Sequence, residues 1–347
     1  MSGAALAVAG GGGALCFARG DVGRPEGEQP AGVPVQLRGL RPEEKVTLIA
    51  LDLADHRRRV LNRLVAETES EAGAEVMVGI ALGRSLFDGT TSRPRHLSVM
   101  PSFPGDLLDP AQTGGDVLVQ IAGRSAERIE AAAERISGAA PADWVPRWRI
   151  SGERRPSATG GRGDLATNPF HFVEGFGNPE TERESYDRAI VSDADDEPPW
   201  AVGGSYQVVR IIRMATELWD RDSVAEQERI IGRKRDGRWL DGAPRDEPPN
   251  FAADPQGRVT PLDSHVRLAA PDRRNPPKIV RRSYGYSRGA DEKGMIFSCF
   301  QRDPVQGFEA VQKRLAGESM ASYLLTVGGG YFFVPPRGDE WTGALSG

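Results

Sequence analysis

The feature that most constrains the fold is an order of strands and helices that occurs twice along the chain. In the first half, apolar and β-branched runs predict strands at 45–53, 75–83, 115–123 and 144–154, and helical spacing predicts helices at 56–68 and 125–140. In the second half, the corresponding strands are at 204–214, 278–286, 294–301 and 331–336, with helices at 223–232 and 304–316. Each half therefore has the order βαββαβ. This is the ferredoxin-like order, in which two helices cover one face of an antiparallel sheet, so we predict a duplicated ferredoxin-like α+β fold.

Local signals fix the ends of two of these helices. Ser125 is a good N-cap for the helix that follows it, and Ile129 and Ile136 lie on one face of that helix. In the second half, Ser223 begins a helix that Gly232 ends. These signals favour helices at equivalent places in the two halves.

The repeat divides the chain into three parts. We predict one ferredoxin-like domain at 32–155 and a second at 156–347, which includes an irregular loop at 170–202. Residues 1–31 are rich in alanine and glycine and carry no charge before Arg19. Two interpretations of this segment remain open: a disordered tail, or an export signal without its basic start. The second would place the protein outside the cytoplasm, and the first leaves a cytoplasmic location as the alternative.

Composition excludes several classes of protein. The net charge is −5, with arginines and acids mixed along the chain, whereas a nucleic-acid-binding protein would show a concentrated basic stripe. The sequence has no apolar segment long enough to span a bilayer. The two cysteines, Cys16 and Cys299, define neither a disulfide framework nor a zinc site. We therefore expect no nucleic-acid partner and no membrane span.

Five blocks of the sequence together resemble the dye-decolorizing peroxidases, a family of heme proteins with this duplicated fold. The blocks, in order, are "MPSFPGDLLDPAQTGGDVLVQI", "GGSYQVVRIIRMATELWDRDSVAEQERIIGRKR", "HVRLAAP", "KIVRRSYGYS" and "FQRDPVQGFEAVQKRLA". The resemblance extends over residues 35–337, and it is specific because separate blocks agree in order and spacing. It implies a heme b cofactor bound in the C-terminal half, hydrogen peroxide and a small organic reductant as substrates, and a homo-oligomer of two or more chains.

The same resemblance assigns roles to four residues. His265, in the "HVRLAAP" block, corresponds to the proximal ligand of the heme iron, although a lone histidine is more often an ordinary loop or core residue. Arg281 corresponds to the distal arginine, and Met295 and Phe297 correspond to apolar positions that close over the distal heme face. Since successive strand side chains face opposite ways, Arg281 and its neighbour Arg282 cannot both face the heme.

One departure from the family is certain. Its hallmark is a Gly-x-x-Asp-Gly loop, whose aspartate moves a proton of bound peroxide, and this chain has "EGFGNPET" at 174–181 instead. Either Asn178 replaces the aspartate at the catalytic position, or the middle of the loop has been deleted. An amide cannot transfer a proton, so the usual acid–base group is absent in both cases. Glu174 and Glu180 are the nearest carboxylates that can substitute for it.

Two functions of different class follow. The first is a heme-dependent oxidoreductase with an altered distal site, either a weak peroxidase or an enzyme turned to another heme oxidation. The second is a non-catalytic heme-binding protein in heme or iron handling. Retention of Arg281 favours the enzyme, because a carrier does not need a distal cation. Loss of the aspartate favours the carrier or a changed reaction.

Overall fold

The computed structural model describes residues 43–54, 58–73, 75–156, 166–179, 181–245, 247, 249–272, 275–289, 291–336 and 341–345. Residues 34–347 form one compact unit, and the account below concerns that unit alone. The segment 1–31, for which we predicted a tail or an export signal, lies outside the described residues. In the described part of the chain, every helix is too short or too polar to cross a bilayer.

The N-terminal half contains the predicted βαββαβ order. Its elements are β1 (Lys45–Leu53), α2 (Arg58–Glu71), β2 (Val76–Gly83), β3 (Val117–Gly123), α3 (Ala126–Gly138) and β4 (Trp144–Glu153). The strands are arranged in the order β4-β1-β3-β2, and every pairing is antiparallel. The Ser125 hydroxyl caps α3 as predicted, since it accepts a hydrogen bond from the Arg128 amide.

The C-terminal half repeats this arrangement with additions. Its elements are β8 (Ser205–Met214), α5 (Thr216–Trp219), α6 (Val224–Ile231), β9 (Val280–Arg288), β10 (Glu292–Gln301), a π-helical turn (Val305–Glu309), α8 (Ala310–Leu315) and β11 (Leu324–Val334). The strand order β11-β8-β10-β9 is the order of the first half again. The duplicated ferredoxin-like prediction is confirmed.

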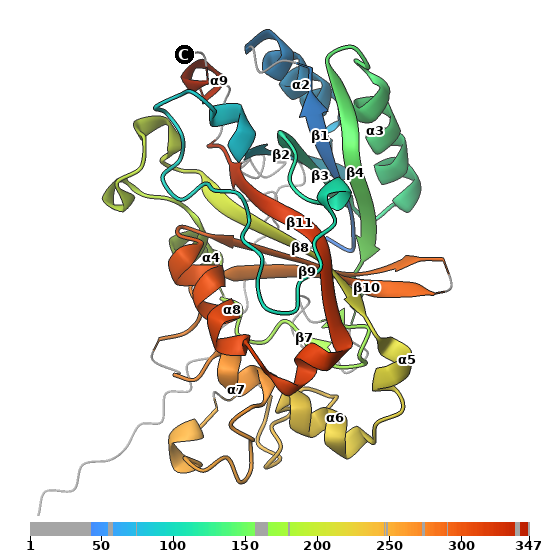
Figure 1. Cartoon of the computed structure of the whole chain (residues 1–347), viewed down its shortest axis with the longest axis vertical. Coiled ribbons are helices and arrows are strands. Elements are labelled where there is room, and N and C mark those ends of the chain that lie inside the picture. Colours follow the sequence, from blue (N-terminus) through green and yellow to red (C-terminus); the bar gives the residue numbers. More distant parts are fainter. Residues whose placement is uncertain are drawn as a thin grey trace, which may run out of the picture. The chain divides into compact units, whose positions relative to one another are not determined.

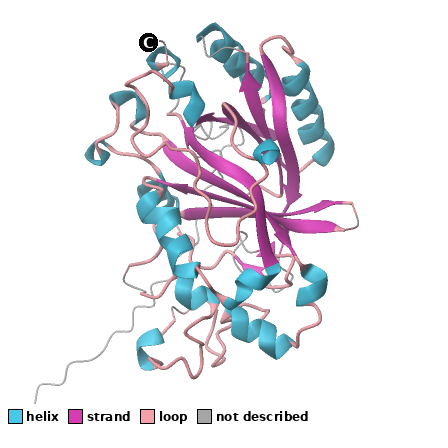
Figure 2. Ribbon diagram, viewed as in Figure 1, coloured by secondary structure: helices cyan, strands magenta, loops and turns pink. Residues whose placement is uncertain are grey.

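The two halves share one closed barrel of eight strands. One junction joins β2 to β11, where Gly83 pairs with Phe332, and the other joins β4 to β9, where Glu153 pairs with Gly285. In both junctions the second strand of one half pairs with the fourth strand of the other. Figures 1 and 2 show the strands meeting at the centre of the unit, with α2 and α3 at one end and α6, α7 and α8 at the other.

The core follows the alternation of side chains along the strands. Inside the barrel, Leu48 of β1 and Ile211 of β8 belong to one buried cluster. On the outer face of the N-terminal strands, Ile49 packs in a second cluster with Leu61 of α2 and Ile129 of α3. The outer face of the C-terminal strands is covered differently, because the long insertions of that half lie over it.

These insertions carry short elements that frame the site. They are β5 (Arg155–Pro156), β6 (Ala166–Thr167), β7 (Val173–Glu174), α4 (Glu182–Ala189) and α7 (His265–Ala269). Strands β5, β6 and β7 form a small antiparallel sheet of their own. Helix α7 packs against α8 and α6. Loop residues are thus held between the barrel and the helices.

The last strand differs from its prediction. We predicted a strand from residue 331, but β11 begins at Leu324. Three glycines, 328–330, hide the strand signal, and the structure explains them. A Cβ atom at Gly328 would lie 2.4 Å from the Gln112 carbonyl oxygen, and Gly329 has φ of +120°, which a residue with a side chain rarely adopts.

Candidate active site

A cavity of about 390 Å³ lies between the outer face of the C-terminal strands and the helices that cover it. Most of its lining is apolar, for example Ile212, Met295, Phe297, Leu315, Met320 and Leu324. A few polar groups also reach it, among them the His265 ring and the Arg281 guanidinium. A concave apolar space with a few converging polar groups is the usual form of a small-molecule or cofactor site.

The sheet forms one wall of this cavity. Arg281 and Ser283 of β9 and Met295 and Phe297 of β10 line it, and Ser283 pairs directly with Phe297 across the two strands. Arg282 does not line the cavity. It lies on the other face of β9, towards the barrel interior, as alternation along a strand requires.

Helix α7 presents His265 from the opposite, helical wall. The Nδ1 atom of His265 lies 2.7 Å from Oε2 of Glu318, and only 6% of the Glu318 side chain is exposed. Within the described part of the chain, the Nε2 atom of His265 has no hydrogen-bond partner. A carboxylate that accepts from Nδ1–H fixes the tautomer in which Nε2 carries a lone pair. The His265 ring is therefore prepared to bind a metal ion through Nε2.

The Arg281 guanidinium is held by the short loop that follows β7. Its Nη2 atom donates a hydrogen bond to the Phe176 carbonyl oxygen. Burial lowers the pKa of Arg281, and the nearby Glu174 carboxylate raises it. A guanidinium stays charged under all ordinary conditions, so a fixed cation faces the cavity.

The same loop places Asn178 against the main chain of Arg281. The Asn178 Oδ1 atom accepts from the Arg281 amide at 2.9 Å, and Nδ2 donates to the Arg281 carbonyl oxygen at 3.0 Å. Asn178 does not line the cavity. The Asn178 amide therefore fastens the loop to β9 and does not reach into the cavity. Glu180 lies outside the described residues.

Glu174 is the carboxylate that the loop does bring to the cavity. It lies at the end of β7, lines the cavity, and takes a hydrogen bond from the Asn168 side chain. Burial raises the pKa of Glu174, while the charges of Arg154 and Arg281 oppose that rise. The pocket thus contains one carboxyl group with a raised pKa and one permanent cation.

Two further arginines reach the cavity, and both are held by neighbours. The Arg233 guanidinium lies 3.7 Å from the ring centre of Trp239 and 4.5 Å from that of Phe176. Arg210 forms a buried ion pair with Asp106, in which Nη1 lies 2.9 Å from Oδ2. These contacts stabilise the walls on either side of the cavity.

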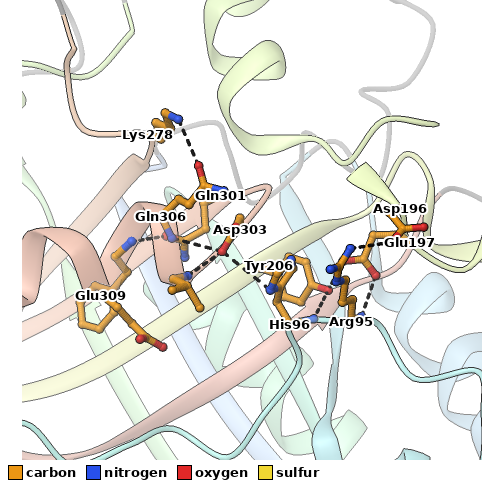
Figure 3. Close-up of polar contacts among 12 residues, drawn as sticks. Arg95, His96, Asp196, Glu197, Tyr206, Lys278, Gln301, Asp303, Gln306 and Glu309 are labelled. Carbon is orange, nitrogen blue, oxygen red and sulfur yellow. Dashed lines mark hydrogen bonds and ion pairs between the residues drawn. The ribbon is translucent and has the colours of Figure 1, made fainter. Parts of the chain in front are cut away.

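A second polar cluster lies outside the cavity (Figure 3). The Tyr206 hydroxyl donates to Glu197 at 2.6 Å and accepts from the main-chain amide of His96 at 3.0 Å. The Arg95 amide donates to the other oxygen of Glu197 at 2.7 Å. None of these four residues lines the cavity. The cluster fastens two surface loops to β8 and has no visible part in the site.

Two family models match this chain. The Dyp-type peroxidase N-terminal model matches residues 45–154, and the Dyp-type peroxidase C-terminal model matches residues 166–339. The chain belongs to the Dyp-type peroxidase family. The predicted family is confirmed, and with it the heme b cofactor that characterises this family.

Several relatives of known name or structure share this framework. The chain is 38% identical over 274 residues to a protein named deferrochelatase from Yersinia pestis, and 36% identical over 274 residues to one from Escherichia coli. These matches cover 75% of the chain but only 63% and 65% of the two relatives. Among solved structures, ferric DtpA from Streptomyces lividans is 29% identical, with a TM-score of 0.79 over 91% of this chain and 95% of its own. A DyP-type peroxidase from Streptomyces coelicolor is also 29% identical, with a TM-score of 0.77 over 89% and 92%.

The residues present fit a heme. A flat apolar macrocycle needs apolar walls, and Met295, Phe297 and Met320 supply them. Its iron needs an axial ligand, and His265 offers an oriented ring nitrogen on the helical wall. Arg281, which lines the same cavity from the sheet wall, would stabilise negative charge on a ligand of the iron.

The sequence predicted most of these positions but not their partners. His265, Arg281, Met295 and Phe297 all line one cavity, whereas Asn178 lies beside it. Glu318 was missed, although a partner for His265 was to be expected in general. It lies 53 residues further along the chain, and no local pattern marks it.

Proposed function

We propose that this chain is a heme-dependent oxidoreductase that uses hydrogen peroxide slowly to oxidise a small organic reductant. The supporting observation is the pair of groups that face one apolar cavity from two walls. One is a histidine oriented by a carboxylate, and the other is a partly buried arginine. A simple carrier of heme needs the first of these groups but not the second.

In this proposal, His265 binds the iron through Nε2 as the proximal ligand. Glu318 keeps the proton on Nδ1 and makes the ring a stronger electron donor, because its carboxylate accepts a short hydrogen bond. The apolar side chains Met295 and Phe297 hold the macrocycle and keep water from the reacting side.

Arg281 acts on the peroxide from the sheet wall. Its guanidinium stabilises the negative charge that develops on the departing oxygen when the O–O bond breaks. Asn178 positions this arginine through its main chain and has no direct chemical role. A bound heme would supply the electrons for breaking the peroxide bond, and the organic reductant would return them.

The missing aspartate makes the step slow. General acid–base help is worth about 10²–10⁴-fold in rate, which corresponds to roughly 3–5 kcal/mol of barrier. Arg281 supplies charge stabilisation but cannot transfer a proton. We therefore propose a weaker peroxidase than those that keep the full loop.

The test is a heme titration followed by absorption spectroscopy. Addition of heme to the purified protein gives a Soret band that saturates at one heme per chain. His265→Ala abolishes the saturable band, whereas His171→Ala keeps it, since His171 is exposed and paired with Asp220 outside the cavity. Equal heme binding by the wild type and His265→Ala would overturn the assignment.

A second function, in heme or iron handling, is favoured by the names of the relatives. "Deferrochelatase" denotes removal of iron from heme, and those proteins are 36–38% identical to this chain. A fluorescence assay separates the two functions, because porphyrin without iron fluoresces and heme does not. Release of iron-free porphyrin without any oxidation of an organic reductant by peroxide would favour this second function.

We also propose that the protein is a homo-oligomer and acts outside the cytoplasm. The first follows from the family, and the second from the composition of residues 1–31. Sedimentation of the purified chain and fractionation of the producing cells test them.

A further inference from the structure

The loop that replaces the family's hallmark brings a different acid to the cavity. Residues 174–178 run from the end of β7 past the Arg281 guanidinium, with the Phe176 carbonyl oxygen bonded to its Nη2 atom. The Asn178 amide closes this turn onto β9. Because both ends of the turn are fixed, Glu174 at its start has a defined place beside Arg281.

Glu174 has the surroundings of a group that exchanges protons with a ligand. It lines the cavity at the end of β7, where Glu174 pairs with Ala166 of β6, and the Asn168 side chain lowers its pKa. The charged groups that act on it are Arg154, from the end of the barrel strand β4, and Arg281. Burial favours its protonated form and the two arginines favour its ionised form. The charge of a ligand that enters the cavity therefore adds directly to the forces that set the protonation state of Glu174.

We propose that Glu174 is the acid–base group of this cavity and takes the place of the deleted aspartate. This inference rests on the proposed function. The carboxylate takes the proton from one oxygen of hydrogen peroxide and becomes a carboxylic acid. It then gives that proton to the other oxygen as the O–O bond breaks, so that this oxygen leaves as water. A bound heme would supply the two electrons that this break requires. Arg281 balances the negative charge during both transfers.

Anion binding tests this assignment without turnover. Fluoride bound in the cavity needs a proton donor, and the acid form of Glu174 supplies one. Above the pKa of Glu174, each fluoride that binds must bring one proton with it. The fluoride affinity of the heme-loaded protein should therefore fall about tenfold per pH unit above that pKa. Glu174→Gln keeps the shape but cannot ionise, so its fluoride affinity should be independent of pH over the same range.

The controls separate this role from a simple counter-charge. Glu69→Gln, on the exposed face of α2, should behave as the wild type, and Glu174→Asp should restore a pH dependence with a shifted midpoint. If Glu174 only neutralises the charge of Arg281, Glu174→Gln would change the fluoride affinity by the same factor at every pH and leave its dependence on pH intact. That result would overturn the proposal. In stopped flow with peroxide, Glu174→Gln should react more slowly than the wild type, by part of the about 10²–10⁴-fold that a well-placed acid–base group is worth, because the displaced carboxyl gives only part of that help. An unchanged rate in Glu174→Gln would also overturn the proposal for Glu174. A wild type that binds no heme would instead contradict the proposed function.

Discussion

The bond between His265 and Glu318 allows a quantitative prediction. Glu318→Gln keeps the size of the side chain but replaces a charged acceptor by a neutral one. The bond is 2.7 Å long, and Glu318 is almost fully buried, so water does not screen it. Hydrogen bonds to charged groups contribute about 1.5–3 kcal/mol and neutral ones about 0.5–1.5 kcal/mol. The loss of about 1–2 kcal/mol corresponds to a decrease of roughly 10-fold in heme affinity, near the lower end of the 10–100-fold typical of such partners.

The assay is transfer of heme to an excess of a heme-free globin. Heme should leave Glu318→Gln about tenfold faster than the wild type, and the reduction potential of the iron should rise because the ring donates less electron density. Glu69→Gln again serves as the control. Unchanged loss rate and unchanged potential in Glu318→Gln would refute the assigned role of this carboxylate.

Two further predictions concern the walls of the cavity. Asp106→Asn leaves the buried Arg210 without its counter-charge and should lower the free energy of unfolding in urea by about 3–5 kcal/mol. Adding Arg210→Met to the same chain should restore part of that loss. A loss under about 1 kcal/mol in Asp106→Asn would show that the pair is not needed for stability. Asn178→Asp places a carboxylate oxygen against the Arg281 carbonyl in place of a donor, so it should cost about 1–3 kcal/mol of stability and should not speed the reaction with peroxide. A faster reaction would mean that position 178 does reach the cavity.

Local patterns predicted those parts of the structure that depend on local geometry. The cap at Ser125 and the alternation of Arg281 and Arg282 both follow from the geometry of one helix and one strand. The start of β11 could not be predicted from local pattern, because its glycines allow a distant loop to approach closely at Gln112. A glycine that is needed because a distant segment packs closely against the strand has a low strand propensity, so it weakens the strand pattern in the sequence.

The residues of the site were also predictable only in part. Single positions such as His265 could be named from the blocks in which they stand. The Glu318 carboxylate that orients this histidine could not, because only folding brings residues 53 apart into contact. The contacts of Asn178 could not be predicted from the sequence either, since its amide bonds to the main chain of Arg281, 103 residues further along the chain.

The central claim is that Arg281, facing a heme held by His265, drives a slow reaction with peroxide. Single-turnover stopped flow of the heme-loaded protein with hydrogen peroxide tests this claim most directly. The wild type is compared with Arg281→Leu and Arg282→Leu, once a thermal unfolding transition has shown that each variant is folded. The account predicts a slow spectral change in the wild type, a further large decrease in rate for Arg281→Leu, and a rate near that of the wild type for Arg282→Leu, whose side chain faces the barrel interior. Equal rates in the wild type and Arg281→Leu would contradict it.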